Sequence, residues 1–384
     1  MKKILIFSIA YFPFVGGAEV AVKEITDRIN AGFDLITLRF DKKFPKFERI
    51  GNVNVYRIGF TKKDALNKIL FPFLALPIAL SLHKKEKYQC VWAIMAAYSG
   101  FAALFFKLMR PEVKYLLTLQ EGDPIDYIKK KTRFVRPLFK KVFTKADKIQ
   151  AISNYLACFA SDMGYKGQVN VIPNAVDFAR FSRDFSESEM EEVKRNLNIH
   201  DNEILLIHTG RIVLKNGISD IIKSLTYLPA NIKFLSVGSG PDLEKLKNLS
   251  EELDVESRVI FHDFVFHAEL VKFLKIANIF VRPSLSEGLG NSFLEAMAAG
   301  LPVIASASGG IPDFLFDPEI NKDKAPTGLF CEVENPKSIA EKVKIYLDNS
   351  ELKDEIKKNA KEMVEKEYSW DIVAGRMKKL FLYL

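Results

Sequence analysis

Residues 283–305 read PSLSEGLGNSFLEAMAAGLPVIA, and this stretch decides the fold. It follows a short apolar segment, residues 279–281, which is typical of a buried strand. A loop with two glycines comes next, then a helical segment at 292–299 and a second apolar strand at 302–305. A strand, a loop, a helix and another strand in this order predict a βαβ unit whose two strands run parallel.

The same alternation extends over most of the 384 residues, a length that suggests two domains. Strands such as ILLIH (204–208) and FLSVG (234–238) are apolar on both faces, which suits parallel sheets covered by helices on both sides. We therefore predict an α/β chain of two doubly wound, Rossmann-like domains that face each other across a cleft. The predicted strands are 4–10, 34–39, 53–58, 90–95, 115–119, 148–152, 169–172, 203–209, 233–237, 258–261 and 328–331, and the predicted helices are 18–30, 217–226, 242–253 and 267–276.

Residues 177–192 interrupt the alternation. Residues 178–185 have no clean period, and an acidic helical stretch follows, so we expect a hinge here. The charge is divided in a similar way: residues 1–180 contain 30 Lys and Arg and 15 Asp and Glu, a net charge of +15, whereas residues 181–384 carry −7. The two halves are therefore expected to face different partners.

Composition and targeting features favour a cytoplasmic protein. The cysteines, Cys90, Cys158 and Cys331, are far apart, which fits neither a disulfide framework nor a zinc site, and we expect buried thiols in a reducing compartment. A first buried strand explains the apolar run at 4–10 better than a signal peptide does. The apolar segment 69–82 contains two prolines and is shorter than the roughly 18 residues that a membrane-spanning helix needs.

The loop GRIVLKNG (210–217) follows a predicted strand and carries two cations four residues apart. Arg211 can present a planar fork to phosphate, and Lys215 a mobile positive charge. Together they could hold a diphosphate, and a solvated basic loop is the alternative.

Two further glycine-bearing loops follow predicted strands. In PFVGGAE, Gly16 and Gly17 would let the backbone approach an anion ahead of a helix, although a tight turn explains them equally well. In VGSGPD, which contains Gly238, we expect turn chemistry in which Asp242 caps the next helix.

Two carboxylates in the quoted stretch, Glu287 and Glu295, are separated by seven residues. Glu287 belongs to the loop and Glu295 to the first turns of the helix, so both can lie beside one ligand. Carboxylates accept hydrogen bonds from sugar hydroxyls, and loop amides at a helix N-terminus suit phosphate. Because Glu287 and Lys215 lie in loops, replacing either with alanine is expected to reduce activity while leaving the fold intact.

The segment SEGLGNSFLEAMAAGLPVIA, with its Glu-x7-Glu spacing, resembles the signature of the family 4 retaining glycosyltransferases of GT-B fold. The GGAE loop, IPNAVD (172–177), the GR…K loop, VGSGP and a terminal YSWD helix follow in that family's order, so the resemblance spans nearly the whole chain. It implies a retaining hexosyltransferase that moves a sugar from a UDP- or GDP-linked donor to an acceptor hydroxyl, in cell-surface glycan or glycolipid synthesis. In such enzymes the last helix crosses back to the first domain, which implies domains of 1–178 with 367–384 and of 179–366.

The resemblance also implies roles for individual residues. Arg211 and Lys215 are expected to bind the donor diphosphate. Glu295 is expected to bind the ribose, and Glu287 to contact hydroxyls of the transferred sugar. The remaining donor-site candidates are Gly16, Gly17, Gly210, Gly238, Gly288, Leu289, Gly290 and Asn291.

The sequence departs from the family on the acceptor side. Many relatives carry a His in the loop after the strand at 115–119, whereas this loop reads LQEGD, so Gln120 or Glu121 takes its place. Asp123 and Asn174 are further acceptor-side candidates, and Ala175 replaces the glycine that usually follows Asn174. The acceptor therefore stays open between a glycan, a lipid-linked molecule and a small molecule.

No cofactor and no metal ion are expected. No Asp-x-Asp motif appears where a metal would be needed, and Arg211, Lys215 and the helix after Glu287 would stabilise negative charge on the leaving diphosphate.

Two rival functions remain. The first is another GT-B enzyme that acts on sugar nucleotides, such as an epimerase, which would convert the donor without an acceptor, or a phosphorolytic enzyme. The second is a non-catalytic binding subunit, which the replaced His would suit.

Residues 129–148 (KKKTRFVRPLFKKVFTKADK) contain nine Lys and Arg and one acidic residue, interleaved with apolar side chains. This pattern is typical of a helix that binds an anionic membrane surface, and predicts an enzyme peripheral to the cytoplasmic face of the membrane. A solvated helix with a buried apolar side is the alternative. No nucleic acid partner is expected, because no nucleic-acid-binding motif accompanies the charge. The lysines around 69–82 add to the charge: Lys62, Lys63, Lys68, Lys84, Lys85 and Lys87.

Overall fold

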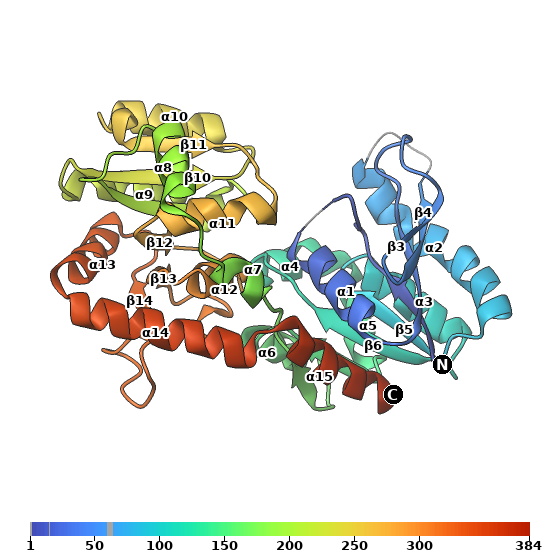
Figure 1. Cartoon of the computed structure of the whole chain (residues 1–384). Coiled ribbons are helices and arrows are strands. Elements are labelled where there is room, and N and C mark those ends of the chain that lie inside the picture. The colour runs from blue at the N-terminus through green and yellow to red at the C-terminus, as the bar shows by residue number, and fades with distance from the viewer. Residues whose placement is uncertain (1, 15, 60–63) are drawn as a thin grey trace. The chain divides into compact units, whose positions relative to one another are not determined.

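A computed structural model describes residues 2–14, 16–59 and 64–384 (Figure 1). Val15 of the PFVGGAE loop, together with Lys62 and Lys63, lies outside the described residues. The chain divides into two compact units, unit 1 with Met1–Ala175 and Trp370–Leu384, and unit 2 with Val176–Ser369. The predicted boundaries, after residues 178 and 366, each lie three residues away from these.

Unit 1 is built on an eight-stranded sheet with the order β3-β4-β2-β1-β5-β6-β7-β8. The edge strand β3 pairs antiparallel with β4, and the other neighbours pair in parallel. The strand β3 was not predicted from the sequence, because its side chains alternate between exposed and half-buried positions and form no apolar run. The strands are β1 (Lys3–Phe7), β2 (Gly32–Leu38), β3 (Phe47–Ile50), β4 (Val53–Ile58), β5 (Cys90–Ile94), β6 (Lys114–Leu119), β7 (Lys148–Ala151) and β8 (Val169–Val171).

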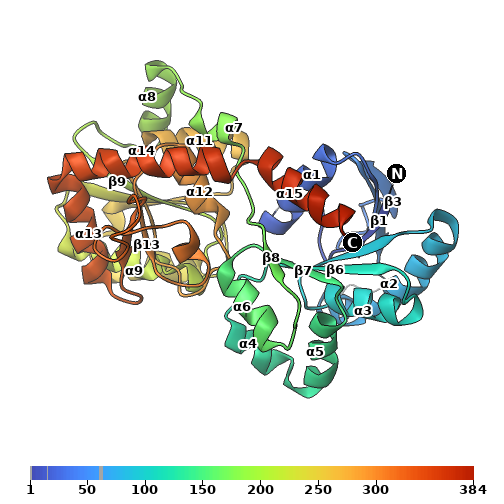
Figure 2. The same ribbon diagram turned by 90° about the horizontal axis from the view of Figure 1, so that it is seen from below.

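Helices cover both faces of this sheet. α1 (Gly17–Arg28) and α15 (Trp370–Leu382) lie on one face, and α2 (Asp64–Glu86), α3 (Ser99–Met109) and α5 (Arg136–Thr144) lie on the other (Figure 2). Two more helices, α4 (Ile125–Lys131) and α6 (Asn154–Asp162), complete the unit.

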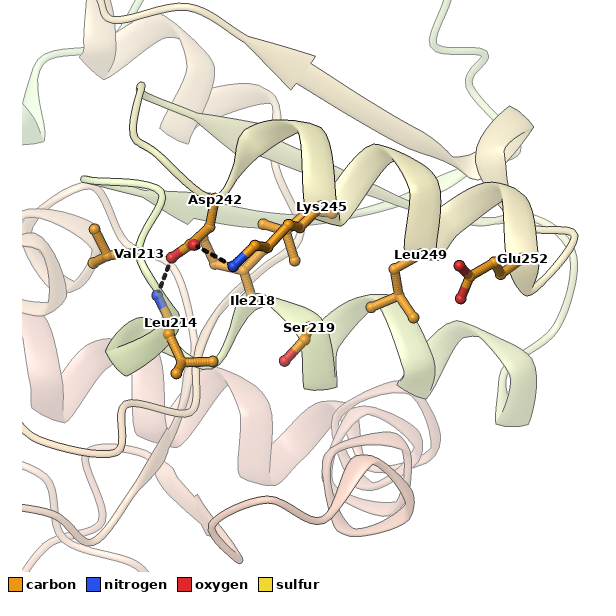
Figure 3. A pocket seen from close by; sticks show the side chains of 9 residues that line it. Val213, Leu214, Ile218, Ser219, Asp242, Lys245, Leu249 and Glu252 are labelled. Atoms are coloured by element: carbon orange, nitrogen blue, oxygen red, sulfur yellow. Dashed lines mark hydrogen bonds and ion pairs between the residues drawn. The ribbon is translucent and has the colours of Figure 1, made fainter.

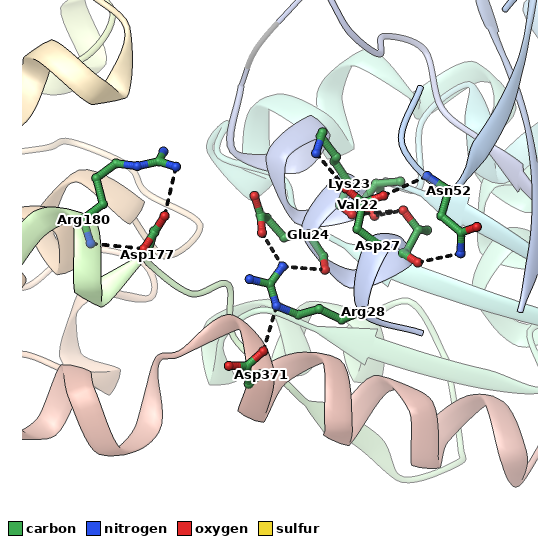
Figure 4. A network of polar contacts seen from close by, with 10 residues as sticks. Val22, Lys23, Glu24, Asp27, Arg28, Asn52, Asp177, Arg180 and Asp371 are labelled. Carbon is green, nitrogen blue, oxygen red and sulfur yellow. Dashed lines mark hydrogen bonds and ion pairs between the residues drawn. The ribbon is translucent and has the colours of Figure 1, made fainter. Parts of the chain in front are cut away.

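The C-terminal helix α15 belongs to unit 1 although it is last in the chain. Its apolar side chains recur at helical spacing, and Trp370, Met377 and Phe381 are buried in one cluster with residues of β1, β5 and α1. Arg28 of α1 donates through Nε to Asp371 Oδ1 at 2.9 Å (Figure 4). Burial of the apolar stripe therefore holds the end of the chain on the first sheet.

Helix α2 differs from the sequence prediction. The apolar segment 69–82 was expected to be too short and too rich in proline to span a membrane, yet it belongs to one 23-residue helix with Pro72 and Pro77 inside it. By length and composition alone, one helix among the described residues, Ala65–Glu86, could cross a membrane, and 28% of that stretch is buried. The difference arises because polar residues at both ends extend the helix beyond the apolar run.

Unit 2 is built on a six-stranded parallel sheet with the order β11-β10-β9-β12-β13-β14. Its main core lies between this sheet and α9, α10 and α13, while α11 and α12 cover the opposite face and α14 packs on α12. Its strands are β9 (Ile204–Thr209), β10 (Ile232–Val237), β11 (Val259–His262), β12 (Ile279–Arg282), β13 (Val303–Ser306) and β14 (Leu329–Cys331). Its helices are α7 (Phe178–Ser182), α8 (Glu187–Asn196), α9 (Ile218–Ser224), α10 (Leu243–Glu252), α11 (His267–Ile276), α12 (Asn291–Ala298), α13 (Pro336–Asp348) and α14 (Ser350–Glu367).

The predicted order of strands and helices is confirmed in both units, with shifts of a few residues at the ends of elements. One expectation about the cysteines is wrong. Cys90 and Cys331 are buried, but Cys158 is exposed, because it lies on the outer side of α6, whose buried residues include Phe159.

Candidate active site

The carboxyl ends of β9, β10 and β12 carry three loops that hydrogen bonds join together. The backbone N–H of Ile212 donates to Ser239 at 3.0 Å, and that of Asp242 donates to Ile212 at 3.3 Å. On the other side, the N–H of Leu285 donates to the carbonyl of Lys215 at 2.7 Å. Because β10, β9 and β12 are neighbours in the sheet, these loops form one continuous edge.

Two glycines are required where the first two loops touch. A Cβ atom on Gly238, whose φ is +144°, would lie 2.0 Å from the carbonyl oxygen of Gly210. A Cβ on Gly240 would lie 2.0 Å from the carbonyl oxygen of Ile212. Any side chain at these positions would separate the loops, so packing alone accounts for the glycines.

The predicted capping role of Asp242 is wrong. Its side chain makes no capping bond at the start of α10, and instead its Oδ2 accepts from the backbone N–H of Leu214 at 2.7 Å (Figure 3). This contact lies beside a cavity of about 290 Å³ between α9 and α10. The loop after β9 lies close enough to α10 for the N–H of Leu214 to reach the carboxylate of Asp242. This hydrogen bond therefore fixes the turn that carries Lys215.

The two residues predicted to bind the diphosphate, Arg211 and Lys215, lie on this loop. Arg211 is exposed and Lys215 is half-buried. Directly after Lys215, buried Asn216 donates through Nδ2 to the carbonyl of Arg211 at 2.6 Å and closes the loop on itself. The structure thus brings both cations to the carboxyl end of β9, a strand in the middle of the sheet.

Glu287 lies in the loop between β12 and α12, but it is not an open loop carboxylate. It is 9% exposed, its Oε2 accepts from Arg282 Nη2 at 2.5 Å, and its Oε1 accepts from the N–H of Gly288 at 3.1 Å. The expectation that alanine here would spare the fold therefore changes, because truncation would leave the charge of Arg282 buried without its partner.

The backbone around Glu287 is held equally closely. The carbonyl of Glu287 accepts from the N–H of Gly310 at 3.1 Å, and a Cβ on Gly309 would lie 1.8 Å from that oxygen. Gly290, with φ at +93°, precedes α12. Gly288, Leu289 and Asn291 lie in the same turn, so the predicted amide-bearing segment runs directly into the helix N-terminus.

Glu295 lies on α12 and has a partner, His267, that was not predicted from the sequence. Its Oε1 lies 3.4 Å from Nε2 of His267, the first residue of α11. This hydrogen bond raises the pKa of His267 above its usual value. The position of His267 after β11, at the same edge of the sheet, was the available signal.

Comparisons with known proteins agree with this geometry. A family model described as "Glycosyl transferases group 1" matches residues 189–363, and one described as "Glycosyltransferase Family 4" matches residues 15–180. The chain is a family 4 glycosyltransferase of the GT-B fold. It is 28% identical over 386 residues to an uncharacterized glycosyltransferase of Methanocaldococcus jannaschii, covering 97% of this chain and 96% of the relative.

A second relative of the glycosyltransferase is the alpha-monoglucosyldiacylglycerol synthase of Streptococcus pneumoniae, 24% identical over 329 residues, or 82% of this chain and 73% of the relative. Two solved structures share the fold. Sucrose-phosphate synthase from Thermosynechococcus elongatus has a TM-score of 0.84 at 21% identity, covering 100% of this chain and 99% of that one. Anabaena HepE, solved in complex with UDP and glucose, has a TM-score of 0.81 at 16% identity and full coverage of both chains.

Of the residues predicted for the acceptor side, Gln120 and Glu121 are both buried at the end of β6. Gln120 Oε1 accepts from Asn174 Nδ2 at 3.3 Å, so these two candidates touch, while Asp123 is exposed. Glu121 Oε1 accepts from the N–H of Ala96 at 2.6 Å, and its Oε2 has no partner among the described residues. Burial raises the pKa of Glu121 to about 7.

The loop that Glu121 holds was not apparent from the sequence. Ala96 lies between Met95, with φ at +69°, and Tyr98, with φ at +54°, and neither is a glycine. Left-handed backbone is unfavourable for such residues by about 1–2 kcal/mol each. The Glu121 carboxylate therefore stabilises a strained loop at the end of β5, and no residue type in the loop signals it.

Gly16 and Gly17 are exposed at the start of α1. A Cβ on Gly16 would lie 2.6 Å from Oε2 of Glu19. The Glu19 carboxylate thus turns back over the first turn of its own helix, and partial burial raises its pKa.

Proposed function

We propose that this glycosyltransferase moves a hexose from a nucleotide-sugar donor to an acceptor hydroxyl with retention of anomeric configuration. The observation that carries the proposal is the edge of unit 2, where the Arg211–Lys215 loop is joined to the loop of Glu287. The likeness to HepE, whose solved structures contain UDP and glucose, makes UDP-glucose the first donor to test.

In this proposal the donor diphosphate binds the loop after β9 and the N-terminus of α12. The bond between the anomeric carbon and the phosphate oxygen breaks, and the acceptor oxygen bonds to the same face of the sugar. The acceptor proton passes to a donor phosphate oxygen. Arg211, Lys215 and the helix amides stabilise the negative charge that develops on the leaving diphosphate.

Glu287 and Glu295 contribute by accepting hydrogen bonds. Glu287 receives them from hydroxyls of the transferred sugar, and Glu295 from the ribose. Contacts to the reacting sugar affect the transition state directly, whereas ribose contacts are remote from bond breaking and serve mainly to bind the donor.

The cations Arg211 and Lys215 offset the diphosphate charge in this proposal, so transfer needs no metal ion. Activity is expected to be unchanged in EDTA. Loss of activity in EDTA that magnesium or manganese restores would overturn this part of the proposal.

The proposed acceptor is lipid-linked or close to a membrane. Two relatives support it by name, the monoglucosyldiacylglycerol synthase and a Corynebacterium glutamicum phosphatidylinositol monomannoside mannosyltransferase, 28% identical over 253 residues. The assay incubates UDP-glucose with and without diacylglycerol or a glycolipid, and follows free UDP and the anomeric proton of the product. Conversion of the donor without acceptor would point to an epimerase instead.

The surface of unit 1 supports attachment to the cytoplasmic face of a membrane. From residue 69 to 82, α2 has no charged side chain, although Ile69 is 58% and Phe73 62% exposed. The Phe73 ring lies 5.4 Å from that of Phe105 on α3, whose end exposes Leu108 and Met109. The outer face of a surface helix is normally charged, and an apolar face suits the boundary between lipid headgroups and acyl chains.

The basic segment 129–148 combines features of both interpretations, the membrane-binding helix and the solvated helix with a buried apolar side. Phe139, Val142 and Phe143 of α5 are buried, so this helix has the buried apolar side of the alternative interpretation. Phe134 is 84% exposed, however, and the guanidinium of Arg133 lies 4.3 Å from its ring centroid. An exposed aromatic ring among lysines suits an anionic membrane surface.

Vesicle co-sedimentation tests the attachment. Binding to anionic but not neutral vesicles is expected, and it should weaken with salt, because exposed charges are screened within about 8 Å at physiological ionic strength. Charge reversal at Lys129, Lys130, Lys131, Lys140 and Lys141, or Phe73→Ser on α2, should reduce it. Phe47→Ser on β3, another exposed aromatic position, is the matched control. Equal binding by all variants, or none by the wild type, would contradict the proposal.

A further inference from the structure

Arg282, the last residue of β12, is a buried charge that no proposed step uses. It follows the apolar residues of its strand, precedes Pro283 and is 9% exposed. Burying a charge is unfavourable unless the group is paired and hydrogen-bonded. The arrangement around Arg282 must therefore supply several partners.

All three guanidinium nitrogens of Arg282 have acceptors. Nε donates to Ser284 Oγ at 3.2 Å, and Nη1 donates to Ser292 Oγ at 2.7 Å. Nη2 donates both to Asn216 Oδ1 at 3.0 Å and to Glu287 Oε2 at 2.5 Å. These acceptors come from the loop after β9, the loop after β12 and the first turn of α12.

Asn216 extends this network to the predicted diphosphate loop. While its Oδ1 accepts from Arg282, its Nδ2 donates to the carbonyl of Arg211 at 2.6 Å. A continuous chain of hydrogen bonds therefore runs from the carboxylate of Glu287 through Arg282 and Asn216 to the backbone of Arg211.

The surroundings of Arg282 leave its guanidinium little freedom. It lies 5.4 Å from the ring centroid of Phe293, and even a Cβ on Gly210 would approach Nη1 to 3.5 Å. The nearby imidazole of His208 adds no second charge, because burial and the charge of Arg282 hold its pKa well below the usual value.

We propose that Arg282 is a positioning residue of the donor site, which fixes the Glu287 carboxylate and the Arg211–Asn216 loop in one arrangement before the donor binds. This inference rests on the proposed function. Glu287 is held at Oε2 by Arg282 and at Oε1 by Gly288, so it does not have to be ordered by the substrate. A planar fork with donors in three directions is needed, and the single ammonium of a lysine cannot reproduce it.

The test is a double-mutant cycle in sugar transfer with Arg282→Met, Glu287→Gln and their combination. If Arg282 acts through Glu287, Arg282→Met should lower kcat/KM by about tenfold or more in the wild type, but by only about threefold in Glu287→Gln. Arg282→Lys keeps the charge and should recover part of the loss. Additive losses in folded variants would overturn the inference.

Binding measurements separate positioning from general stabilisation. Arg282→Met and Arg282→Lys should weaken the binding of UDP-glucose more than the binding of UDP, because UDP lacks the sugar that Glu287 contacts. Arg258→Met is the matched control, since Arg258 lies in the same unit and donates to the backbone carbonyls of Ile232, Leu225 and Pro229. It should lower the melting temperature without changing the ratio of the two affinities. If Arg258→Met changed the ratio of the UDP-glucose and UDP affinities as much as the Arg282 variants do, the inference would be overturned. If the wild type transferred no sugar from any donor, the proposed function would be overturned as well.

Discussion

Replacing Glu287 with alanine is expected to destabilise unit 2. The side chains of Glu287 and Arg282 are each 11% exposed, so truncation leaves a guanidinium without its counter-charge in a nearly water-free position. Breaking a buried pair in this way typically costs about 3–5 kcal/mol. Ser284, Ser292 and Asn216 still accept from Arg282, which favours the lower end. For a unit of this size, about 3 kcal/mol corresponds to a melting temperature lowered by roughly 6–12 °C.

The two tryptophans make the measurement specific to one unit. Trp92 and Trp370 both belong to unit 1, so tryptophan fluorescence follows unit 1, while calorimetry follows both units. The Glu287→Ala variant should shift a calorimetric transition that fluorescence does not report. Glu287→Gln, which keeps an oxygen acceptor for Arg282, should shift it less.

Two controls complete this experiment. The double variant Glu287→Ala/Arg282→Met removes both charges and should recover much of the lost stability. Glu319→Ala breaks a pair with Lys342 in which Glu319 is 72% exposed, and should change unfolding by less than about 1 kcal/mol. If Glu287→Ala melted within about 2 °C of the wild type, below the range expected for a buried pair, the reasoning would be refuted.

Three further outcomes are expected. Gly240→Ala should raise the KM for the donor and lower the melting temperature, because its Cβ would meet the carbonyl of Ile212. Gly375→Ala in the middle of α15, where a Cβ has free space, should stabilise the fold by about 0.5–1 kcal/mol. Equal melting temperatures of the two variants would contradict this. Burial raises the pKa of Glu121 from 4.5 to about 7, and Tyr115 and Asp123 are the titratable groups that interact with it. Between these two pH values the folded protein therefore keeps a proton that the unfolded chain releases. Stability, measured as the urea midpoint, should therefore fall as the pH rises from 4.5 to 7. Glu121→Gln should reduce this fall. The same pH dependence in Glu121→Gln and in the wild type would exclude a protonated Glu121. Glu295→Gln should raise the donor KM with little effect on kcat, and a defect in kcat alone would exclude a ribose contact.

The sequence predicted the backbone of the loops at the carboxyl ends of the strands better than the side-chain contacts around them. Gly238 and Gly290 follow strands in recognisable turns, so their places in the loops were foreseeable. The contacts of Asp242 and Glu287 were not foreseeable. Asp242 looked like a helix cap but accepts from the backbone N–H of Leu214 in another loop, and Glu287 looked like an open carboxylate but pairs with Arg282, five residues earlier. A local preference is overridden when the fold brings an N–H or a guanidinium within hydrogen-bond distance of the same carboxylate.

The sequence by itself determined the order of the strands other than β3, the two-domain α/β fold and the family, because hydrophobic periodicity and the Glu287-x7-Glu295 spacing are written in consecutive residues. Tertiary structure alone decided that α2 presents an apolar face, that Glu121 holds a strained loop and that Arg282 joins Glu287 to Arg211. Arg282 and Asn216 are 66 residues apart in the chain. They meet because β9 and β12 are neighbours in the sheet, and strand order is set by the packing of the whole unit, which no local pattern encodes.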